Sequence, residues 1–404
     1  MDDLFPESGG LARSVQLQVD ELAAAGHDVT VFAPSRGFVA PTRGGAGPLP
    51  YWHIPGTPGF MFSLASTPAV AGRVAAEHPL DVVHTQSERG ALFLGAMVAR
   101  RLGVPHIHTF HSNYSGSHPA YPISGIANSL GYLPAVSRIL RVAAHAGTPP
   151  VRTVAVREPG DARLAATDWR SLAAIAAEVD AYTAPAPYLI DRIDAASGGT
   201  LAGRGHAIPS GVAEAFRNAR RQRPHEATIR FLSCSRLGPE KRVDAILDAF
   251  ELAAEDSWEL RIVGAGPIEA ALRHQASQST RGHVRFLGHF RDADAIAQEF
   301  ADADVVVLAS DGFDTQGLVL AEAATTSTPI LYCDGRLTVG TGPDNALLTG
   351  PSAADLAEGM RTLANDPDRR ARMSAAAATV APTLSAATMC GRYVDVYRSA
   401  ISTL

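Results

Sequence analysis

Lysine is almost absent from this chain. Lysine and arginine together number 35, and Lys241 is the only lysine among them. Arginine therefore occupies nearly every position where either cation would serve. An ammonium and a guanidinium are not equivalent where a compact, rotatable charge must meet a phosphate. The retained lysine makes position 241 a candidate anion-binding site, although a chance survivor on a solvated helix start is the plainer alternative.

Three further absences limit the class of protein. The three cysteines lie far apart, at Cys234, Cys333 and Cys390, so we expect neither a metal site nor a disulfide, and a reducing cytoplasm. No apolar run reaches the roughly 18 residues that a membrane span requires, and the first residues do not have the pattern of a signal peptide. The formal net charge of −6 offers no basic face for a nucleic-acid partner.

What the chain does contain is a regular alternation of short apolar segments and helical stretches. Its 404 residues, 46% of them hydrophobic, suffice for two or three domains with sizeable cores. Such alternation implies parallel sheets with right-handed crossovers, here in two sets that suggest two Rossmann-like domains. The expected strands are residues 28–34, 81–86, 105–111, 180–186, 206–212, 227–235, 258–266, 283–290, 304–310 and 328–333.

The small, glycine-rich stretch 195–205 reads as an interdomain linker. It predicts an N-terminal domain over residues 1–205 and a C-terminal domain over 206–383. A final helix over 384–404 then carries apolar residues spaced to pack, namely Leu384, Tyr393, Tyr397 and Ile401.

Two carboxylates stand eight positions apart near the end of the second set, Asp314 and Glu322. A Gln-Gly turn between them opens an apolar helix near Gly317, so the free N–H groups near Gly317, Leu318 and Val319 would form an anion site. A ligand with a phosphate in the middle and hydroxyls at both ends suits that site, as a sugar nucleotide does. An ordinary βαβ unit with an acidic loop is the plainer alternative.

These segments resemble those of glycosyltransferase family 4, a family of retaining enzymes with the GT-B fold. The stretch from Asp314 to Glu322 resembles the family's acid–seven residues–glutamate motif, and LSCSRLGPEKRVDAILDAF (232–250) resembles its second signature. Other matching segments, such as GHDVTVFAP and TFHSNY, occur in family order along almost the whole chain. The resemblance implies an α/β GT-B protein, with two Rossmann-like domains facing across a cleft and a C-terminal helix crossing back to the N-domain.

The resemblance also implies an activity and roles for single residues. The enzyme would move a hexose from a UDP- or GDP-sugar to a hydroxyl acceptor, a lipid or glycolipid among the candidates, with no metal and no cofactor. Arg236 and Lys241 would hold the donor diphosphate, Glu322 the ribose hydroxyls and Asp314 the sugar ring hydroxyls. His111 would contact the donor sugar near the reacting carbon. Gly9 and Gly10 would let the N-domain loop approach the donor phosphate. Gly288 and His289 lie in the turn where relatives read the nucleotide base through backbone groups.

Other histidines and glycines receive weaker assignments. His84 and Glu88 line the same cleft in relatives, whereas His106 and His108 alternate along a strand and are interpreted as structural. The GxG of IVGAGP lacks the third glycine and the ribose-binding acid of a dinucleotide site, so it is interpreted as a tight turn.

The chain departs from the family pattern in three places. The strand that relatives carry before DLFPESGG is missing, which predicts an N-domain without one central strand. Asp314 is one methylene shorter than the glutamate of many relatives, and Ser327 stands where a glycine is usual.

Two other functions stay open. A catalytically silent GT-B protein would bind a sugar nucleotide or a partner without turnover, and an epimerase of the same fold would isomerise the donor without an acceptor. The apolar, arginine-bearing stretch 132–152 suggests peripheral contact with the inner face of the membrane. The residues do not identify the sugar, the acceptor, the linkage or the oligomeric state.

Overall fold

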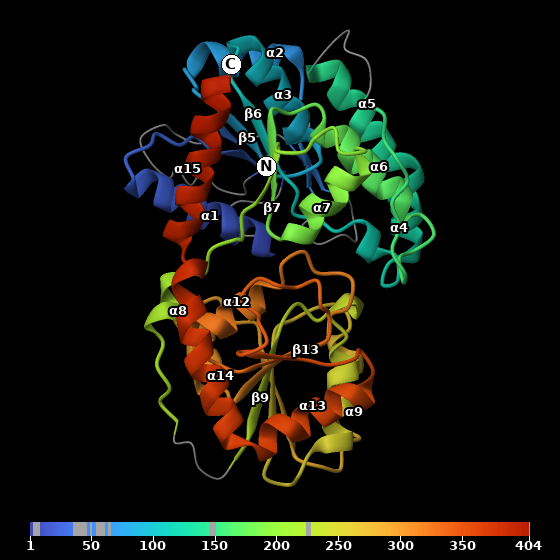
Figure 1. Ribbon diagram of the computed structural model, residues 1–404, viewed down its shortest axis with the longest axis vertical. Helices are drawn as coiled ribbons and strands as arrows, with labels where there is room; N and C mark the ends of the chain where they lie inside the picture. Colours follow the sequence, from blue (N-terminus) through green and yellow to red (C-terminus); the bar gives the residue numbers. More distant parts are fainter. Residues whose placement is uncertain are drawn as a thin grey trace. The chain divides into compact units, whose positions relative to one another are not determined.

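The computed structural model describes residues 1–2, 9–34, 47–48, 51–53, 61–63, 66–144, 151–223 and 228–403. The chain forms two compact units (Figure 1). The first consists of Met1–Gly211 with Met389–Leu404, and the second is Val212–Thr388. Each unit contains a parallel sheet with helices packed on it, as the alternation of apolar segments predicts.

Within the described ranges, the sheet of the first unit has four parallel strands in chain order: β5 (Val83–Thr85), β6 (His106–Thr109), β7 (Ala181–Ala184) and β8 (Gly205–Ala207). The two central strands, β6 and β7, are buried along their whole length, as strands covered on both faces must be. Short strands form two further pairs, β1 (Phe32–Ala33) with β2 (Gly47–Pro48) and β3 (Tyr51–His53) with β4 (Met61–Ser63).

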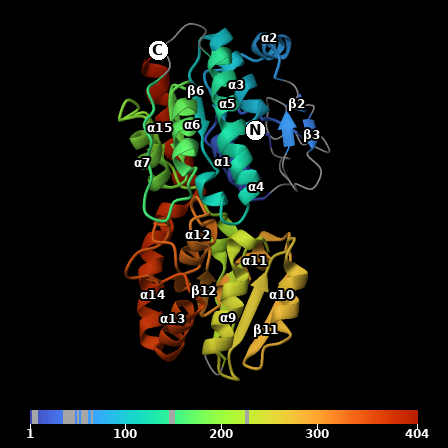
Figure 2. The same ribbon diagram turned by 90° about the vertical axis from the view of Figure 1, so that its right-hand side faces the viewer.

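The helices of this unit surround that sheet. Helices α3, α5 and α6 lie side by side (Figures 1 and 2). Between α4 and α5, residues Asn128–Tyr132 continue the helix as a π-turn. The helices are α1 (Gly9–Ala24), α2 (Pro68–Glu77), α3 (Gly90–Leu102), α4 (Pro122–Ala127), α5 (Leu133–Ala144), α6 (Ala165–Ala176), α7 (Pro187–Ala196) and most of α15 (Ala386–Thr403).

The sheet of the second unit contains six parallel strands among the residues that the structure describes. Their spatial order is β11 (His283–Gly288), β10 (Glu259–Val263), β9 (Arg230–Cys234), β12 (Val305–Leu308), β13 (Ile330–Tyr332) and β14 (Ala346–Leu348). The chain starts in the middle at β9, moves outward to β11 and returns to β12 on the other side of β9. Ligands of doubly wound sheets bind at such a switch point, beside the carboxyl ends of the two central strands.

Apolar helix faces close both sides of this second sheet. Phe231 of β9 packs against Phe250 of α9 and against Trp258, all three almost fully buried. The helices are α8 (Glu214–Asn218), α9 (Val243–Ala253), α10 (Glu269–Ala276), α11 (Ala293–Asp302), α12 (Leu318–Thr325), α13 (Ala353–Asn365) and α14 (Pro367–Val380).

The predicted linker at 195–205 is wrong. Gly198, Gly199 and Gly203 have φ values of 64, 80 and 84°, so they form the turns between α7 and β8 inside the first unit. The chain passes to the second unit at Gly211–Val212 instead. A glycine-rich stretch indicates backbone with positive φ. Such backbone occurs in tight turns within a domain as well as in linkers between domains.

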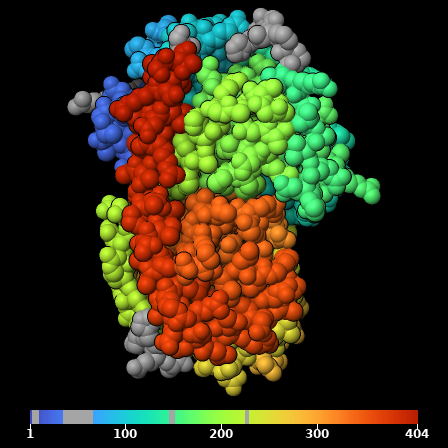
Figure 3. Space-filling view, viewed as in Figure 1, coloured from blue at the N-terminus to red at the C-terminus, as the bar shows by residue number. Residues whose placement is uncertain are grey.

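The expected return of the chain to its first unit is confirmed. Residues from Met389 onward belong to that unit, and Figure 3 shows them in red on its surface. Leu384 falls outside this helix, because a 3₁₀ turn over Ala381–Leu384 precedes α15 in the second unit. Among the helices of the described ranges, none is long and apolar enough to cross a bilayer.

Candidate active site

The loop that follows β9 is fixed by the turn that follows β10. A Cβ atom on Gly264 would lie 1.9 Å from the carbonyl oxygen of Ser235, and one on Gly266 would lie 2.3 Å from that of Leu237. The N–H of Leu237 also donates to the carbonyl of Ala265 at 3.0 Å. The glycines of IVGAGP therefore let two backbones touch, and this tight turn sets the position of the loop that carries Arg236.

Arg236 lies at the start of that loop and Lys241 in the 3₁₀ turn that follows it, and each of these cations has an acidic partner. The Nζ atom of Lys241 donates to the Asp314 carboxylate, and these side chains are 17 and 12% exposed. The ring of Phe313 lies 5.6 Å from the same Nζ. Arg236 pairs with the buried Glu240 one turn later, while half of the Arg236 side chain remains exposed. The switch point of the sheet thus brings Arg236, Lys241 and Asp314 together.

Helix α12 begins at Leu318, as the Gln-Gly turn predicts. Its N-cap residue, Gly317, is left-handed at φ 68° and supplies no side-chain cap. A Cβ atom there would lie 3.1 Å from Leu337, so close packing favours glycine as well. The uncapped first turn, including Leu318 and Val319, gives the backbone donors and positive dipole end of an anion site. Glu322 follows inside the helix and is buried.

The loop between β12 and α12 has a support that the sequence reasoning missed. Asp334, just after β13, accepts a hydrogen bond from the N–H of Gly312 at 2.9 Å. The same carboxylate accepts two more from the Arg336 guanidinium, at 2.9 and 3.0 Å. The signal was present, because Asp334 follows a predicted parallel strand just as the other site residues do.

The expected base-reading turn lies on the same edge of the sheet, two strands from β9. Gly288 ends β11 with φ 73°, and its carbonyl accepts from the N–H of Gly264 at 2.9 Å. His289 follows it and is exposed. The loops that follow β9, β10, β11, β12 and β13 therefore all lie at the carboxyl ends of parallel strands.

In the first unit, His111 follows β6 and joins a chain of amides. Its Nε2 lies 2.9 Å from the Gln86 side-chain oxygen, and the Gln86 amide donates to Gln18 at 2.6 Å. Burial lowers the pKa of His111 to about 4, and nearby Glu88 only partly offsets this. The imidazole is therefore neutral at pH 7, and its hydrogen bond to the Gln86 oxygen places the proton on Nε2. Gln86 and Gln18 are two further site residues that the sequence did not indicate.

Glu88 is buried beside β6, the strand that His111 follows. Burial alone would raise its pKa, but His108, whose Nε2 lies 3.7 Å from the carboxylate, lowers the pKa below its ordinary value. The hydroxyl of Tyr114 donates to the same carboxylate at 3.2 Å. A buried carboxylate thus remains ionised next to His111.

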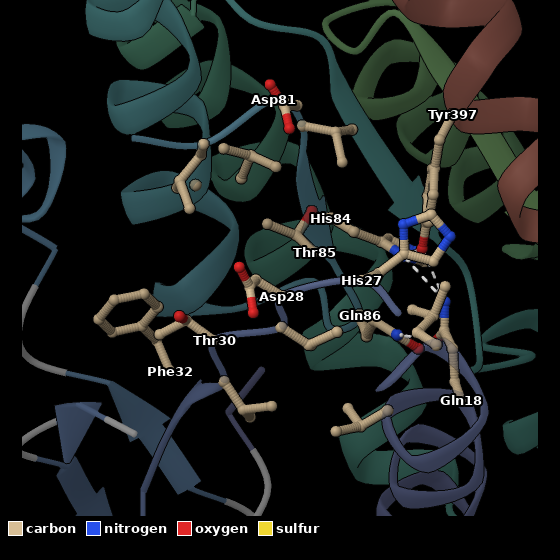
Figure 4. Close-up of a pocket in the computed structure, with 18 of the residues that line it drawn as sticks. Gln18, His27, Asp28, Thr30, Phe32, Asp81, His84, Thr85, Gln86 and Tyr397 are labelled. Carbon is tan, nitrogen blue, oxygen red and sulfur yellow. Dashed lines mark hydrogen bonds between the residues drawn. The ribbon is translucent and has the colours of Figure 1, made fainter. Parts of the chain in front are cut away.

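Three other histidines of this unit form hydrogen bonds between β5 and β6. His106 and His108 each lie 2.9 Å from the hydroxyl of Thr85, as expected of structural residues. His84 bridges the hydroxyls of Tyr397 (Figure 4) and Thr109, at 2.7 Å each. Burial, more than the neighbouring histidines, lowers the pKa of His84 well below its ordinary value.

The glycine pair near the start forms the first turn of α1. Gly9 and Gly10 open this helix, and a Cβ atom on Gly10 would meet nothing within 4 Å. The N-domain phosphate contact expected of them therefore falls at an uncrowded helix N-terminus. The preceding residues 3–8 lie outside the described ranges.

Comparisons with known proteins agree with this arrangement. The model of Glycosyltransferase Family 4 matches residues 8–216, just over half of the chain. The model described as Glycosyl transferases group 1 matches residues 228–366. The chain belongs to glycosyltransferase family 4 and is a hexosyltransferase of the GT-B fold.

Two relatives and two solved structures illustrate the likeness. The alpha-monoglucosyldiacylglycerol synthase of Streptococcus pneumoniae is 26% identical, over 82% of this chain and 69% of that protein. The GDP-mannose-dependent alpha-(1-6)-phosphatidylinositol dimannoside mannosyltransferase of Mycobacterium tuberculosis is 31% identical, over 44% of this chain and 51% of that protein. The chain thus matches only about half the length of that mannosyltransferase.

The solved structures show the shared fold. Sucrose-phosphate synthase from Thermosynechococcus elongatus superimposes with a TM-score of 0.68 at 17% identity, covering 100% of this chain and 96% of that chain. HepE of Anabaena in complex with UDP gives 0.67 at 16% identity, covering 98% of each.

Proposed function

We propose that this enzyme transfers a hexosyl group from a UDP- or GDP-linked sugar to a hydroxyl of a membrane lipid or glycolipid, with retention and without a metal. One observation is the main support for the assignment of a sugar-nucleotide donor. Lys241, the only lysine, meets Asp314 at the switch point of the second sheet. The uncapped start of α12 follows Asp314 within four residues.

The chemistry needs positive charge at this place. The bond from the sugar carbon to the diphosphate breaks, the acceptor oxygen bonds to the same face of that carbon, and its proton leaves with the diphosphate. Negative charge grows on the leaving group, so fixed cations and backbone N–H groups stabilise the transition state. Lys241, Arg236 and the first turn of α12 supply both kinds of group.

The Lys241–Asp314 ion pair gives donor binding a second effect. A diphosphate competes with Asp314 for the ammonium, because both are anions that accept from the same Nζ. Turning Lys241 towards the phosphate releases the Asp314 carboxylate to accept hydrogen bonds from the sugar ring hydroxyls. Diphosphate and sugar recognition would thereby be coupled through one side chain.

The assignment of a lipid acceptor is supported by two relatives and by one exposed surface. The two relatives are an alpha-monoglucosyldiacylglycerol synthase and a phosphatidylinositol dimannoside mannosyltransferase, so both names include a glycolipid. On the outer side of α4 and α5, five large apolar residues are between 50 and 85% exposed. This exposed stripe consists of Ile123, Ile126, Leu130, Ile139 and Val142. Patches of this kind mark interaction sites.

The charge around the exposed stripe fits an anionic bilayer. From position 89 to position 157 the chain has seven arginines and no aspartate or glutamate, although its net charge is −6. Arg138 is exposed on the same helix as Ile139 and Val142. Each cation near an anionic membrane contributes about 1 kcal/mol, and apolar residues on an interfacial helix add to this. The stripe begins upstream of the expected stretch 132–152, of which residues 145–150 lie outside the described ranges.

Vesicle binding tests the acceptor half. We expect co-sedimentation with phosphatidylglycerol vesicles at low salt, and at least a tenfold loss of binding for Leu130→Asp. Leu252→Asp is the matched control, because Leu252 is also about half exposed but lies in the second unit. Equal loss in both variants, or no binding of the unmodified enzyme, would contradict a membrane acceptor.

Measurements of donor binding and turnover test the assignment of the sugar-nucleotide donor. A panel of UDP- and GDP-sugars should raise the melting temperature for one nucleotide, since ligand at 100 times its Kd adds about 2.7 kcal/mol of stability. That donor should then yield free nucleoside diphosphate with lipid vesicles in excess EDTA. Binding without turnover would favour a silent protein, and donor isomerisation would favour an epimerase.

A further inference from the structure

Arg242, which directly follows Lys241, has a backbone conformation that long side chains rarely adopt. Its φ and ψ angles are 50 and 41°, in the left-handed region. Among the described residues other than glycine, only Arg242 and Ser327 have a positive φ. This region is unfavourable for a residue with a Cβ atom, which crowds the following carbonyl oxygen. Strained backbone of this kind persists only where surrounding contacts hold it, and it is common at functional sites.

The side chain of Arg242 makes contacts that hold this backbone in place. Its guanidinium donates to the carbonyl oxygen of Ala309 at 3.2 Å and to that of Pro351 at 2.6 Å. Ala309 directly follows β12, and Pro351 precedes Ser352, the N-cap residue of α13. Helices α9 and α13 lie side by side (Figure 1). One side chain therefore joins the start of α9 to the end of β12 and to the start of α13.

The backbone of Arg242 connects the turn that carries Lys241 to helix α9. The 3₁₀ turn Pro239–Lys241 ends just before Arg242, and α9 begins at Val243 just after it. The N–H of Arg242 donates to the carbonyl of Pro239 at 3.3 Å, and the carbonyl of Arg242 accepts from the N–H of Ala245 at 3.1 Å. A single left-handed residue between two right-handed turns sets the angle between them. It thereby sets the direction in which the Lys241 side chain leaves the backbone.

Arg242 and Lys241 contact two points of the same loop. Arg242 donates to Ala309, where the loop leaves β12, and Lys241 donates to Asp314, near the start of α12. The same loop is held between these points by Asp334, which accepts from the N–H of Gly312. Two adjacent residues of the chain therefore fix the loop at both of its ends.

We propose that Arg242 is a positioning residue that clamps the Lys241 turn to the end of β12 and so keeps Lys241 in contact with Asp314. The inference rests on the proposed function, in which the donor diphosphate takes over the Lys241 ammonium. A clamp at Ala309 would hold the ammonium and the carboxylate at fixed positions before the donor binds. Groups that are positioned in advance need little reorganisation when charge develops on the leaving diphosphate.

Because Lys241 is the only lysine, its contact with Asp314 is directly observable. Protein labelled with [ε-¹³C]lysine gives one NMR signal, and Asp314→Asn gives the position of that signal without the ion pair. Arg242→Gly removes the guanidinium and adopts the left-handed backbone without strain. We expect its lysine signal to move at least half of the way to that of Asp314→Asn. Its melting temperature should stay within about 3 °C of that of the unmodified protein, since lost hydrogen bonds and relieved strain offset each other.

Arg370→Ala is the matched control for the loss of a guanidinium. Arg370 also donates to two carbonyl oxygens, those of Leu363 and Ala364, but it lies in α14. We expect this variant to lower the melting temperature at least as much as Arg242→Gly does. Its lysine signal and its turnover should remain those of the unmodified protein.

Steady-state kinetics give a second readout. We expect Arg242→Gly to lower kcat about tenfold or more, while KM for the acceptor changes by less than about threefold. Arg242→Lys should recover part of kcat, because an ammonium reaches one of the two carbonyl oxygens.

An unmoved lysine signal in Arg242→Gly would overturn the proposal, and so would an unchanged kcat in that variant. The lysine signal tests the clamp whether or not the protein transfers sugar. The proposed function would fail separately, if the unmodified enzyme neither bound a nucleotide nor turned over a donor.

Discussion

Removing the only lysine is the most informative single change in the second unit. Lys241→Ala deletes the charge-assisted contact that Lys241 is proposed to make with the donor diphosphate, worth roughly 1.5–3 kcal/mol. That corresponds to a loss of about tenfold to more than a hundredfold in kcat/KM. The loss should fall mainly on kcat, because negative charge on the leaving group is greatest in the transition state.

The ion pair adds a stability effect to this substitution. Asp314 is only 12% exposed and loses its Lys241 partner, so we expect the unliganded protein to lose about 1–2 kcal/mol, between the values for surface and buried pairs. Adding Asp314→Asn to Lys241→Ala should restore most of that stability but none of the activity. Lys241→Arg should recover activity only in part, because a planar guanidinium does not occupy the same point.

Steady-state kinetics and thermal unfolding of these variants separate the two roles. If Lys241 had only a structural role, Lys241→Ala would lose stability and turnover, and the double variant would recover both. Near-native turnover in Lys241→Ala would refute the assignment of the phosphate site, whatever its melting temperature.

Three further predictions concern single positions. Ser327 has φ 60°, so Ser327→Gly should stabilise the protein by about 0.5–1 kcal/mol, whereas the same change at Thr326, with φ −83°, should destabilise it in thermal unfolding. Gly264→Ala would place a Cβ atom 1.9 Å from a carbonyl of the neighbouring loop; we expect at least a tenfold weaker donor Kd, and unchanged binding would show that the loop does not hold the donor. Because the pKa of folded His111 is about 4, below its ordinary value of 6.5, the unfolded chain binds more protons between these values. The free energy of unfolding should therefore fall by about 3 kcal/mol as pH drops from 6.5 to 4, and denaturant titrations of His111→Asn should show a smaller fall.

Local patterns predicted the parts of the site that depend on neighbouring residues. The Gln-Gly turn identified the start of α12 to within one residue, because glycine at a left-handed position and the apolar run after it are both local signals. The tight turn at Gly264–Gly266 was also interpreted correctly, since a third glycine was absent. Ser327 was noted as a departure from a usual glycine, and its φ of 60° gives the physical reason for that glycine.

Pairings across long sequence separations could not be predicted in this way. Lys241 and Asp314 are 73 positions apart, and only the order of strands in the sheet brings β9 beside β12. The amide chain from His111 through Gln86 to Gln18 joins two strands and a helix, and glutamine has no spacing signature of its own. The apolar run of strand β14 is only three residues long, Ala346–Leu348, which is too short to distinguish a strand from a loop.

The anomeric configuration of the product distinguishes metal-free retaining transfer from inverting or metal-dependent transfer. The enzyme would be incubated in excess EDTA with an α-linked UDP- or GDP-hexose, chosen by thermal shift, and anionic vesicles that contain diacylglycerol or a phosphoinositide. Proton NMR of the extracted glycolipid then gives its anomeric coupling. We expect an α-linked hexosyl lipid formed without metal, together with one equivalent of free nucleoside diphosphate. A β-linked product, or transfer that stops in EDTA and resumes with a divalent cation, would contradict this expectation.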